Sequence, residues 1–219
     1  MKIGLVMHKN KQLNIGIYIY KNAEVLDFSG PFEVFSTANR LNDTNLHMNV
    51  FLIGETDVSI EARGGFCVIP KYHIHNHPAL DLLIVVGGVH TEEIQKTHIM
   101  QWLQEQGHKV PIMASVCTGA FLLARAGVLN NCQATTHWSD IEEFKQTYPD
   151  IPIIENVRWV DNQNVITSGG ISAGIDMSLH LVSKFCSQQL ALSTAKQMEF
   201  QWTNTGLHCQ GNLEQRVVK

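Results

Sequence analysis

The feature that most constrains the fold is a set of short, continuously apolar runs that alternate with helix-forming segments. The run "DLLIVVGG" (81–88) has five apolar residues before two glycines, and "VPIMA" (110–114) precedes the helix-forming stretch 120–126. Strands without polar alternation are typical of parallel sheets that helices bury on both faces. We therefore predict an α/β fold, a single-domain parallel sheet sandwiched by helices.

The rest of the pattern predicts more elements in the same order. Strands are expected at 14–20, at 46–54 and near Ile153 and Val165, with a hairpin-like insertion over 61–70 that turns at two glycines. Helices are expected from Pro31 to about Leu41, at 91–106 (closed by Gly107), at 139–148 and after "SGGISAGID". This pattern divides the chain into an N-terminal extension (1–13), an α/β domain (14–186) and a C-terminal helix, to about Asn204, with a tail (187–219).

Composition limits the partners. The net charge of −4 and the absence of a Lys/Arg stripe argue against a nucleic-acid partner. No window holds the roughly 18 apolar residues that a membrane span needs, and the basic start is too short in apolar residues for a secretory signal. Five cysteines without a CxxC pair are a poor disulfide or zinc framework. We expect a cytoplasmic protein with reduced thiols and no membrane partner.

Cys117 follows the apolar run 110–114 and precedes the helical run 120–126. At the first turn of a helix, unpaired backbone N–H groups and the helix dipole favour a thiolate. The small residues Thr118 to Ala120 allow close approach of a ligand. The position predicts a nucleophile on a tight strand-to-helix turn, a nucleophile elbow; the alternative is a buried core thiol. The other four cysteines (Cys67, Cys132, Cys186 and Cys209) are interpreted as structural.

Two further features lie at predicted strand ends. Asp27, in "VLDFSGP", either caps the helix expected at Pro31 or faces Cys117 as an acid/base group with a pKa raised by burial. Gly87 and Gly88 either end a strand or aim N–H groups into the crevice as an oxyanion hole. Ligands of parallel sheets bind beyond the carboxyl ends of the strands, so these residues and Cys117 are expected to converge.

Three histidine and glycine motifs are less specific. His137, in "TTHW", is the most plausible imidazole partner for the thiol, or else a core histidine beside Trp138. The HxHxH spacing of "HIHNHP" (73–78) would place three imidazoles on one face of a strand, but no carboxylate or thiol supports a metal site, so a solvated loop is expected. "SGGISAGID" lacks the phosphate-binding lysine and glycine spacings, and close helix–sheet packing explains it better.

Three blocks, "VLDFSGPFEVF" (25–35), "ASVCTGAFLLARAGVLNNCQATTHW" (114–138) and "NVITSGGISAGIDMSLHLV" (164–182), resemble the ThiJ/PfpI superfamily, with "DLLIVVGG" between the first two. The resemblance spans about 15–185 and is nearest to isonitrile hydratases and to the ligand domains of AraC-type regulators. It implies a flavodoxin-like, class I glutamine-amidotransferase-like fold with Cys117 on the elbow, usually assembled as a homodimer.

In the hydratase branch, the matching residues are Cys117 as nucleophile, Asp27 as acid/base and Thr118 lining the site. The implied reaction is hydration of a small isonitrile to an N-substituted formamide, with no metal or organic cofactor. The backbone N–H groups of Gly88 and Val89 would orient substrate or water at the Gly-Gly turn. Two departures from other branches matter: Thr118 stands where the protease branch has histidine, and Asp27 where the deglycase branch has glutamate.

Two other functions compete with the enzyme. One is a free-standing ligand sensor related to AraC-type regulators, although the roughly 34 residues after Phe185 are too short and too weakly basic for two DNA-reading helices. The other is a cysteine-based redox or stress protein of the deglycase or chaperone-like kind, in which an elbow thiolate is readily oxidised.

Overall fold

The structure is a computed structural model that describes residues 12–209, and its centre is a mixed, mostly parallel sheet of eight strands. In spatial order the strands are β10 (Gly206–His208), β8 (Trp159–Asp161), β9 (Val165–Ser168), β7 (Ile112–Val116), β6 (Leu82–Val85), β1 (Gln12–Tyr18), β2 (His47–Gly54) and β5 (Tyr72–His73). The pair β8–β9 is antiparallel and every other neighbouring pair is parallel. The predicted α/β fold is confirmed, with one antiparallel pair added.

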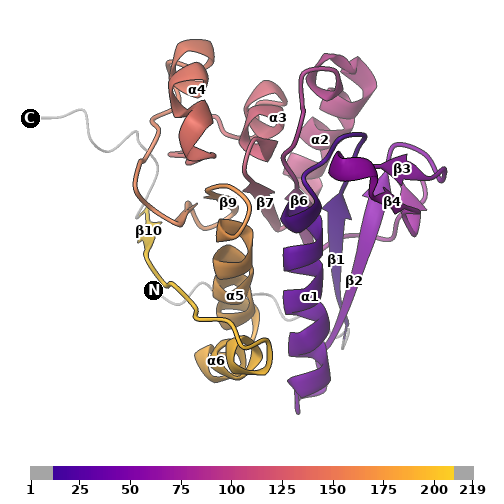
Figure 1. Ribbon diagram of the computed structural model, residues 1–219, viewed down its shortest axis with the longest axis vertical. Helices are drawn as coiled ribbons and strands as arrows, with labels where there is room; N and C mark the ends of the chain where they lie inside the picture. Colours follow the sequence, from indigo (N-terminus) through magenta and orange to yellow (C-terminus); the bar gives the residue numbers. More distant parts are fainter. Residues whose placement is uncertain (1–11, 210–219) are drawn as a thin grey trace, which may run out of the picture.

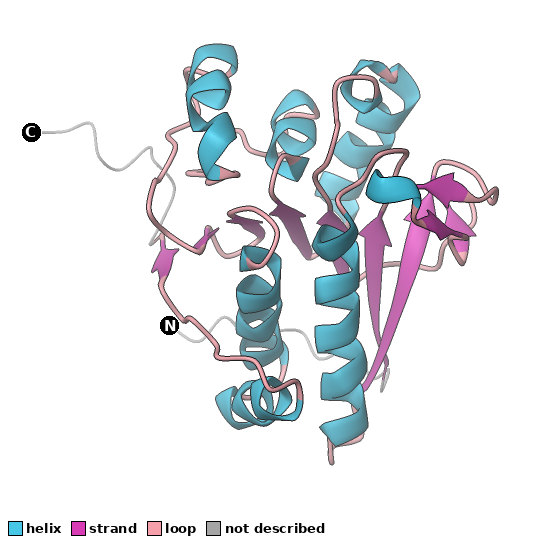
Figure 2. Cartoon of the chain, in the orientation of Figure 1, coloured by secondary structure: helices cyan, strands magenta, loops and turns pink. Residues whose placement is uncertain are grey.

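Helices cover both faces of the sheet. The helices are α1 (Val25–Leu41), α2 (Thr97–Lys109), α3 (Gly119–Arg125), α4 (Ile141–Thr147), α5 (Ala173–Phe185) and α6 (Gln188–Gln197), with short 3₁₀ turns η1 (Arg63–Gly65), η2 (Glu93–Gln95) and η3 (Trp138–Asp140). Helices α1, α5 and α6 contact one another on one face, in front of the strands in Figures 1 and 2, and α2 and α3 pack together, with α3 on β6 and β7. Every residue of β6 and β7 is buried, as the apolar runs predicted.

The small insertion after β2 is also confirmed. Its strands β3 (Ile60–Glu61) and β4 (Cys67–Val68) pair antiparallel around η1. Gly64 and Gly65 have φ angles of +70° and +78°, in the left-handed region that glycine adopts without a steric penalty.

Several predicted boundaries were wrong. The first helix begins at Val25, six residues before Pro31, which lies inside it. The segment expected as one helix over 91–106 is η2 followed by α2, which continues through Gly107 to Lys109. Near Ile153 there is one isolated bridge to Ala134, because the adjacent Pro152 has no N–H for a ladder.

The C-terminal region differs from the expectation as well. Helix α6 ends at Gln197, and Gly206–His208 form the edge strand β10 beside β8. The short strand β8 itself had no clear sequence signal. Most of the predicted extension 1–13 and the last part of the predicted tail, 210–219, lie outside the described residues.

Candidate active site

Cys117 lies on a tight turn between β7 and α3. Its φ is +56°, in the left-handed region that non-glycine residues seldom adopt, and its N–H donates to the carbonyl oxygens of Ser168 (3.3 Å) and Gly169 (3.2 Å). Two residues later, a Cβ on Gly119 would lie 2.2 Å from the Val85 carbonyl oxygen, so only glycine allows the turn to pack against β6. The tight strand-to-helix turn is therefore as predicted, whereas the role of Cys117 as a nucleophile stays a prediction.

Asp27 is fully buried in the first turn of α1. The N-cap of this helix is Glu24, so Asp27 is not the cap that one interpretation of the sequence expected. Its Oδ2 accepts a hydrogen bond from the Gly87 N–H at 3.0 Å, whereas Oδ1 has no partner of ordinary hydrogen-bond geometry in the described part of the chain. An incompletely satisfied, buried carboxylate is costly to keep, which marks this position as chemically unusual.

Gly87 lies where the candidate residues meet. A Cβ on Gly87 would lie 2.8 Å from Asp27 Oδ2, 2.7 Å from Cys117 Cβ and 2.6 Å from the Thr118 backbone nitrogen. Helix α1, the β6 loop and the elbow therefore converge on the Cα of this glycine. The predicted meeting of these residues at the carboxyl ends of the strands is observed.

Thr118 closes the site against the same loop. Its Oγ1 accepts from the Gly88 N–H and donates to the Gly88 carbonyl, both at 3.0 Å. Gly88 has φ +139°, and a Cβ there would lie 2.4 Å from the Asn22 carbonyl oxygen. Thr118 thus fixes the Gly-Gly turn beside the thiol.

The N–H groups predicted to orient the substrate are engaged within the protein. The Gly87 N–H donates to Asp27, the Gly88 N–H to Thr118 Oγ1, and the Val89 N–H to the Asn22 carbonyl at 3.1 Å. An oxyanion hole needs N–H groups that point at the reacting atom. In this geometry the three N–H groups instead position Asp27 and the turn, which is a different role from the one expected.

Burial dominates the electrostatics of the pair Cys117 and Asp27, which we call the dyad. It raises the pKa of Asp27 from 3.8 to about 7, against the lowering effect of the Gly87 N–H. Burial and the negative charge of Asp27 raise the pKa of the Cys117 thiol from 9.0 to about 12, against the N–H groups of Thr118 and Ile171. Burial and the neighbouring carboxylate therefore favour the protonated thiol at neutral pH, which is opposite to the thiolate that the position on a helix turn predicted.

Ile171 is a site residue that the sequence analysis missed. Its backbone N–H lowers the pKa of both Asp27 and Cys117, so it faces both groups. Its φ is +52°, which is a marked outlier for a β-branched residue. The available signal was the pair Gly169–Gly170 directly before it, at the end of β9, which we interpreted as packing alone.

His137 is held away from the role of thiol partner. Its Nδ1 lies 2.8 Å from Ser139 Oγ and 3.2 Å from the Asp140 carboxylate, and its ring packs against Gly170, where a Cβ would lie 1.9 Å from Cδ2. No hydrogen bond within residues 12–209 joins its ring to Cys117. The histidine is thus a neighbour of the Gly169–Ile171 turn.

The histidines of "HIHNHP" do not share a strand face. Strand β5 ends at His73, and His77 instead accepts a hydrogen bond from the Trp102 indole at 3.2 Å. The rings of His73 and His75 meet edge to face at 6.0 Å. This turn fits the expected loop and not the HxHxH metal site.

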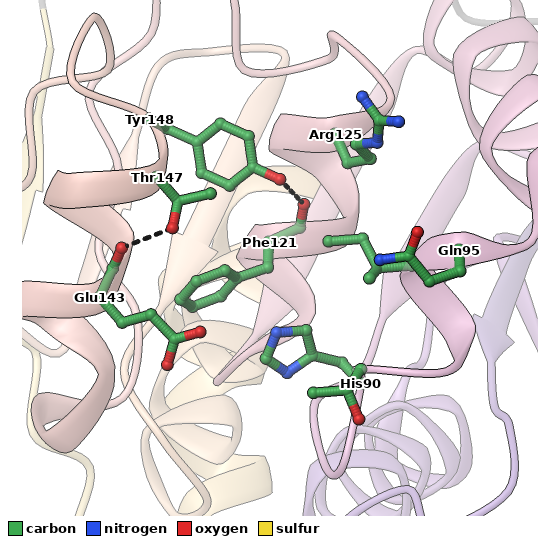
Figure 3. A pocket seen from close by; sticks show the side chains of 9 residues that line it. His90, Gln95, Phe121, Arg125, Glu143, Thr147 and Tyr148 are labelled. Carbon is green, nitrogen blue, oxygen red and sulfur yellow. Dashed lines mark hydrogen bonds between the residues drawn. The ribbon is translucent and has the colours of Figure 1, made fainter.

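A cavity of about 440 Å³ is lined by residues of η2, α3 and α4 (Figure 3), and Cys117, Asp27 and Thr118 are not among the residues that line it. Its floor contains the rings of His90 and Phe121, whose centroids are 4.6 Å apart, and Arg125 and Glu143 lie at its rim. Two contacts connect these rings to the site residues. The Phe121 N–H donates to the Thr118 carbonyl at 3.0 Å, and the His90 ring forms a hydrogen bond with the Gly88 backbone. The size suits a small organic molecule.

Comparisons with known proteins place this geometry in context. The model of the DJ-1/PfpI family matches residues 14–184. The chain is 29% identical over 189 residues to isonitrile hydratase from Pseudomonas putida, covering 86% of this chain and 78% of that protein. It is 27% identical over 191 residues to the HTH-type transcriptional regulator GbdR from Pseudomonas aeruginosa, covering 86% of this chain and 51% of the regulator.

The chain therefore spans about half the length of that regulator. Among solved structures, a THiJ/PfpI family protein from Pseudomonas syringae superposes with a TM-score of 0.77 at 23% identity, covering 91% of this chain and 81% of that chain. This likeness supports the fold. In the described residues 12–209, no helix is long and apolar enough to cross a membrane.

Proposed function

The chain belongs to the DJ-1/PfpI family, and from this premise we propose that it hydrates a small isonitrile to an N-substituted formamide by using Cys117 and Asp27. The observation that carries the proposal is the meeting of two buried groups, the Cys117 thiol and the Asp27 carboxyl group, at Gly87. Burial raises the pKa of Asp27 to about 7. A general acid/base works best with a pKa near the operating pH. We also propose that the enzyme is a cytoplasmic homodimer.

The first step adds the thiol to the terminal carbon of R–N≡C. Sulfur attacks this carbon while the Asp27 carboxylate accepts the S–H proton and delivers it to the same carbon. The S–H bond breaks, C–S and C–H bonds form, and a thioimidate R–N=CH–S results. The protonated resting thiol suits this step, because the proton that the carbon needs is already present.

The second step consumes water. Asp27 accepts a proton from a water molecule that attacks the thioimidate carbon, and the substrate nitrogen is protonated. Breaking the C–S bond returns sulfur to its thiol form with the remaining proton and releases R–NH–CHO. The net reaction is the addition of one water to the isonitrile.

A ligand-sensing function is the second candidate, and the similarity to GbdR favours it. A sensor needs a binding cavity but no proton transfer to carbon. Its prediction is saturable binding of a small molecule near Cys117 without turnover.

The redox alternative has less support from the site. Oxidation requires thiolate character, and burial beside Asp27 raises the pKa of Cys117 to about 12. We expect Cys117 to resist mild peroxide at neutral pH.

The test is formamide production from an alkyl isonitrile, followed by NMR, with intact-mass spectrometry to detect a covalent adduct. We expect turnover by the unmodified protein, none by Cys117→Ala, and a loss of about 10²–10⁴-fold in Asp27→Asn. Cys132→Ala, which removes a thiol outside the site, is the matched control. Turnover that survives in Cys117→Ala refutes the nucleophile, and binding without turnover favours the sensor.

A further inference from the structure

A second cluster of titratable side chains lies away from the dyad. Asp161 ends β8, His180 lies in α5 and His208 ends β10. Because β8 runs antiparallel to β9, with Asp161 opposite Ile166 and Trp159 opposite Ser168, Asp161 lies toward the amino end of β9. The Cys117 turn lies at the other end of that strand, so the cluster is separate from the candidate active site.

We propose that Asp161, His180 and His208 form a binding site for a divalent transition-metal ion such as Zn²⁺. One ligand atom from each side chain lies within 4.8 Å of those of the other two. His180 Nε2 is 2.8 Å and His208 Nδ1 is 3.8 Å from Asp161 Oδ2. Ligand atoms around tetrahedral zinc are about 3.3 Å apart at bond lengths of about 2.0–2.1 Å, and the two observed distances bracket this value.

The ligand types suit the same ion. Two imidazole nitrogens and one carboxylate oxygen make a donor set that zinc accepts, with a fourth position open to water. The side chains of Asp161 and His180 are 5% and 11% exposed, whereas that of His208 is 65% exposed. Two of the three ligand side chains are therefore buried, and an ion can reach the site from the side of His208.

Neighbouring groups hold the two buried ligands and strand β10, which carries His208, in place. The indole of Trp159 stacks on the His180 ring at 3.9 Å with an interplanar angle of 13°. A Cβ on Gly206 would lie 2.1 Å from the same indole, so β10 packs flat against it. The Cys209 N–H donates to the Asp161 carbonyl at 2.9 Å. Supporting contacts of this kind orient metal ligands.

Lys184 competes for the same carboxylate. Its Nζ lies 3.0 Å from both oxygens of Asp161 and also donates to the Gln163 carbonyl at 2.7 Å. A bound cation would replace the ammonium as the counter-charge of Asp161. Lys184 keeps a backbone partner when it is displaced, and its side chain is 26% exposed. The site should therefore gain affinity when this ammonium is removed.

The ion would join three elements that are distant in the chain. Strand β10 is attached to the sheet through its short pairing with β8. An ion bonded to His208, to the Asp161 carboxylate of β8 and to the His180 imidazole of α5 would fasten this edge strand to the domain. Zinc should therefore stabilise the folded state, because an ion that binds the folded form alone shifts the equilibrium by mass action.

The experiment uses the full chain, stripped with EDTA and dialysed against Zn²⁺, with bound metal and Tm measured. We expect one equivalent of zinc, a higher Tm in excess zinc, and at least about tenfold weaker binding in His208→Ala. Lys184→Met should bind more tightly. His75→Ala, which removes an exposed histidine elsewhere, should match the unmodified protein.

Co²⁺ as a second probe distinguishes this site from the thiols, because nitrogen and oxygen ligands give no thiolate charge-transfer band. The proposal is overturned by the absence of stoichiometric zinc binding, by unchanged binding in His208→Ala, or by a thiolate band. Weaker binding in Lys184→Met would also contradict it, since the ammonium would then support the site.

Discussion

Replacing Asp27 with asparagine should stabilise the fold at neutral and alkaline pH while it slows the proposed reaction by about 10²–10⁴-fold. The carboxylate is fully buried, and the fold raises its pKa from 3.8 to about 7. Each tenfold change in a dissociation constant corresponds to about 1.4 kcal/mol, so ionised Asp27 costs the folded state about 4 kcal/mol above pH 7. Asparagine keeps an acceptor for the Gly87 N–H and carries no charge.

The pH dependence has a definite direction. Between about pH 4 and pH 7, the folded chain binds a proton on Asp27 that the unfolded chain has lost, so the stability of the unmodified protein falls as pH rises through this window. Other titrating groups contribute equally to the variant and cancel in the difference. The stability advantage of Asp27→Asn should therefore grow from near zero at pH 4 to about 4 kcal/mol above pH 7.

The assay is urea unfolding of both proteins at several pH values between 4.5 and 8.5, with the exposed Asp57→Asn as control. The control should show no such trend. A difference between Asp27→Asn and the unmodified protein that stays constant across this range would refute the reasoning, because it would mean that Asp27 titrates alike in the folded and unfolded states.

Three further predictions concern the same site. Gly87→Ala should cost about 1–3 kcal/mol in unfolding free energy and abolish turnover, because its Cβ would lie within 2.8 Å of Asp27 and Cys117 atoms; a fully active variant would contradict the observed packing. Thr118→Val should cost about 1–3 kcal/mol in denaturant unfolding, whereas Thr118→Ser retains both hydrogen bonds to Gly88 and should stay near the unmodified stability. Alkylation of Cys117 by iodoacetamide, followed by peptide mass spectrometry, should rise with pH up to at least pH 10; a plateau below pH 8 would show a thiolate instead.

Much of the fold follows from local pattern. The continuous apolar runs 82–86 and 110–114 predicted buried parallel strands, and both are central strands of the sheet. The start of α1 could not be predicted in the same way. Pro31 is favoured in a first helical turn, so it suggested a start there, yet helix α1 begins at Val25 and contains the proline. Packing of α1 on α5 and α6 outweighs the local preference.

The candidate site, like the fold, could be predicted in part. The positions of Cys117, Asp27 and Gly87 at strand ends predicted that they meet, since that depends only on strand order. The charge state of the thiol could not be predicted, because it depends on burial and on the distance to Asp27. The short helix α3 favours a thiolate, but desolvation and a neighbouring carboxylate oppose it more strongly. Ile171 was missed because the two glycines before it were interpreted as packing alone, and a β-branched residue is not expected to have a positive φ.

The dyad and its partners come from four segments, the first turn of α1 and the turns after β6, β7 and β9, and this has a consequence for how the protein folds. Asp27 and Gly87 are 60 residues apart in the chain, and Gly88 and Thr118 are 30 apart. Contacts of such separation form late and slowly, because each closes a long loop before any local gain is available. In a chain that emerges from the ribosome, Cys117 is therefore an ordinary exposed thiol. The pair of Cys117 and Asp27 forms only when the central sheet is complete.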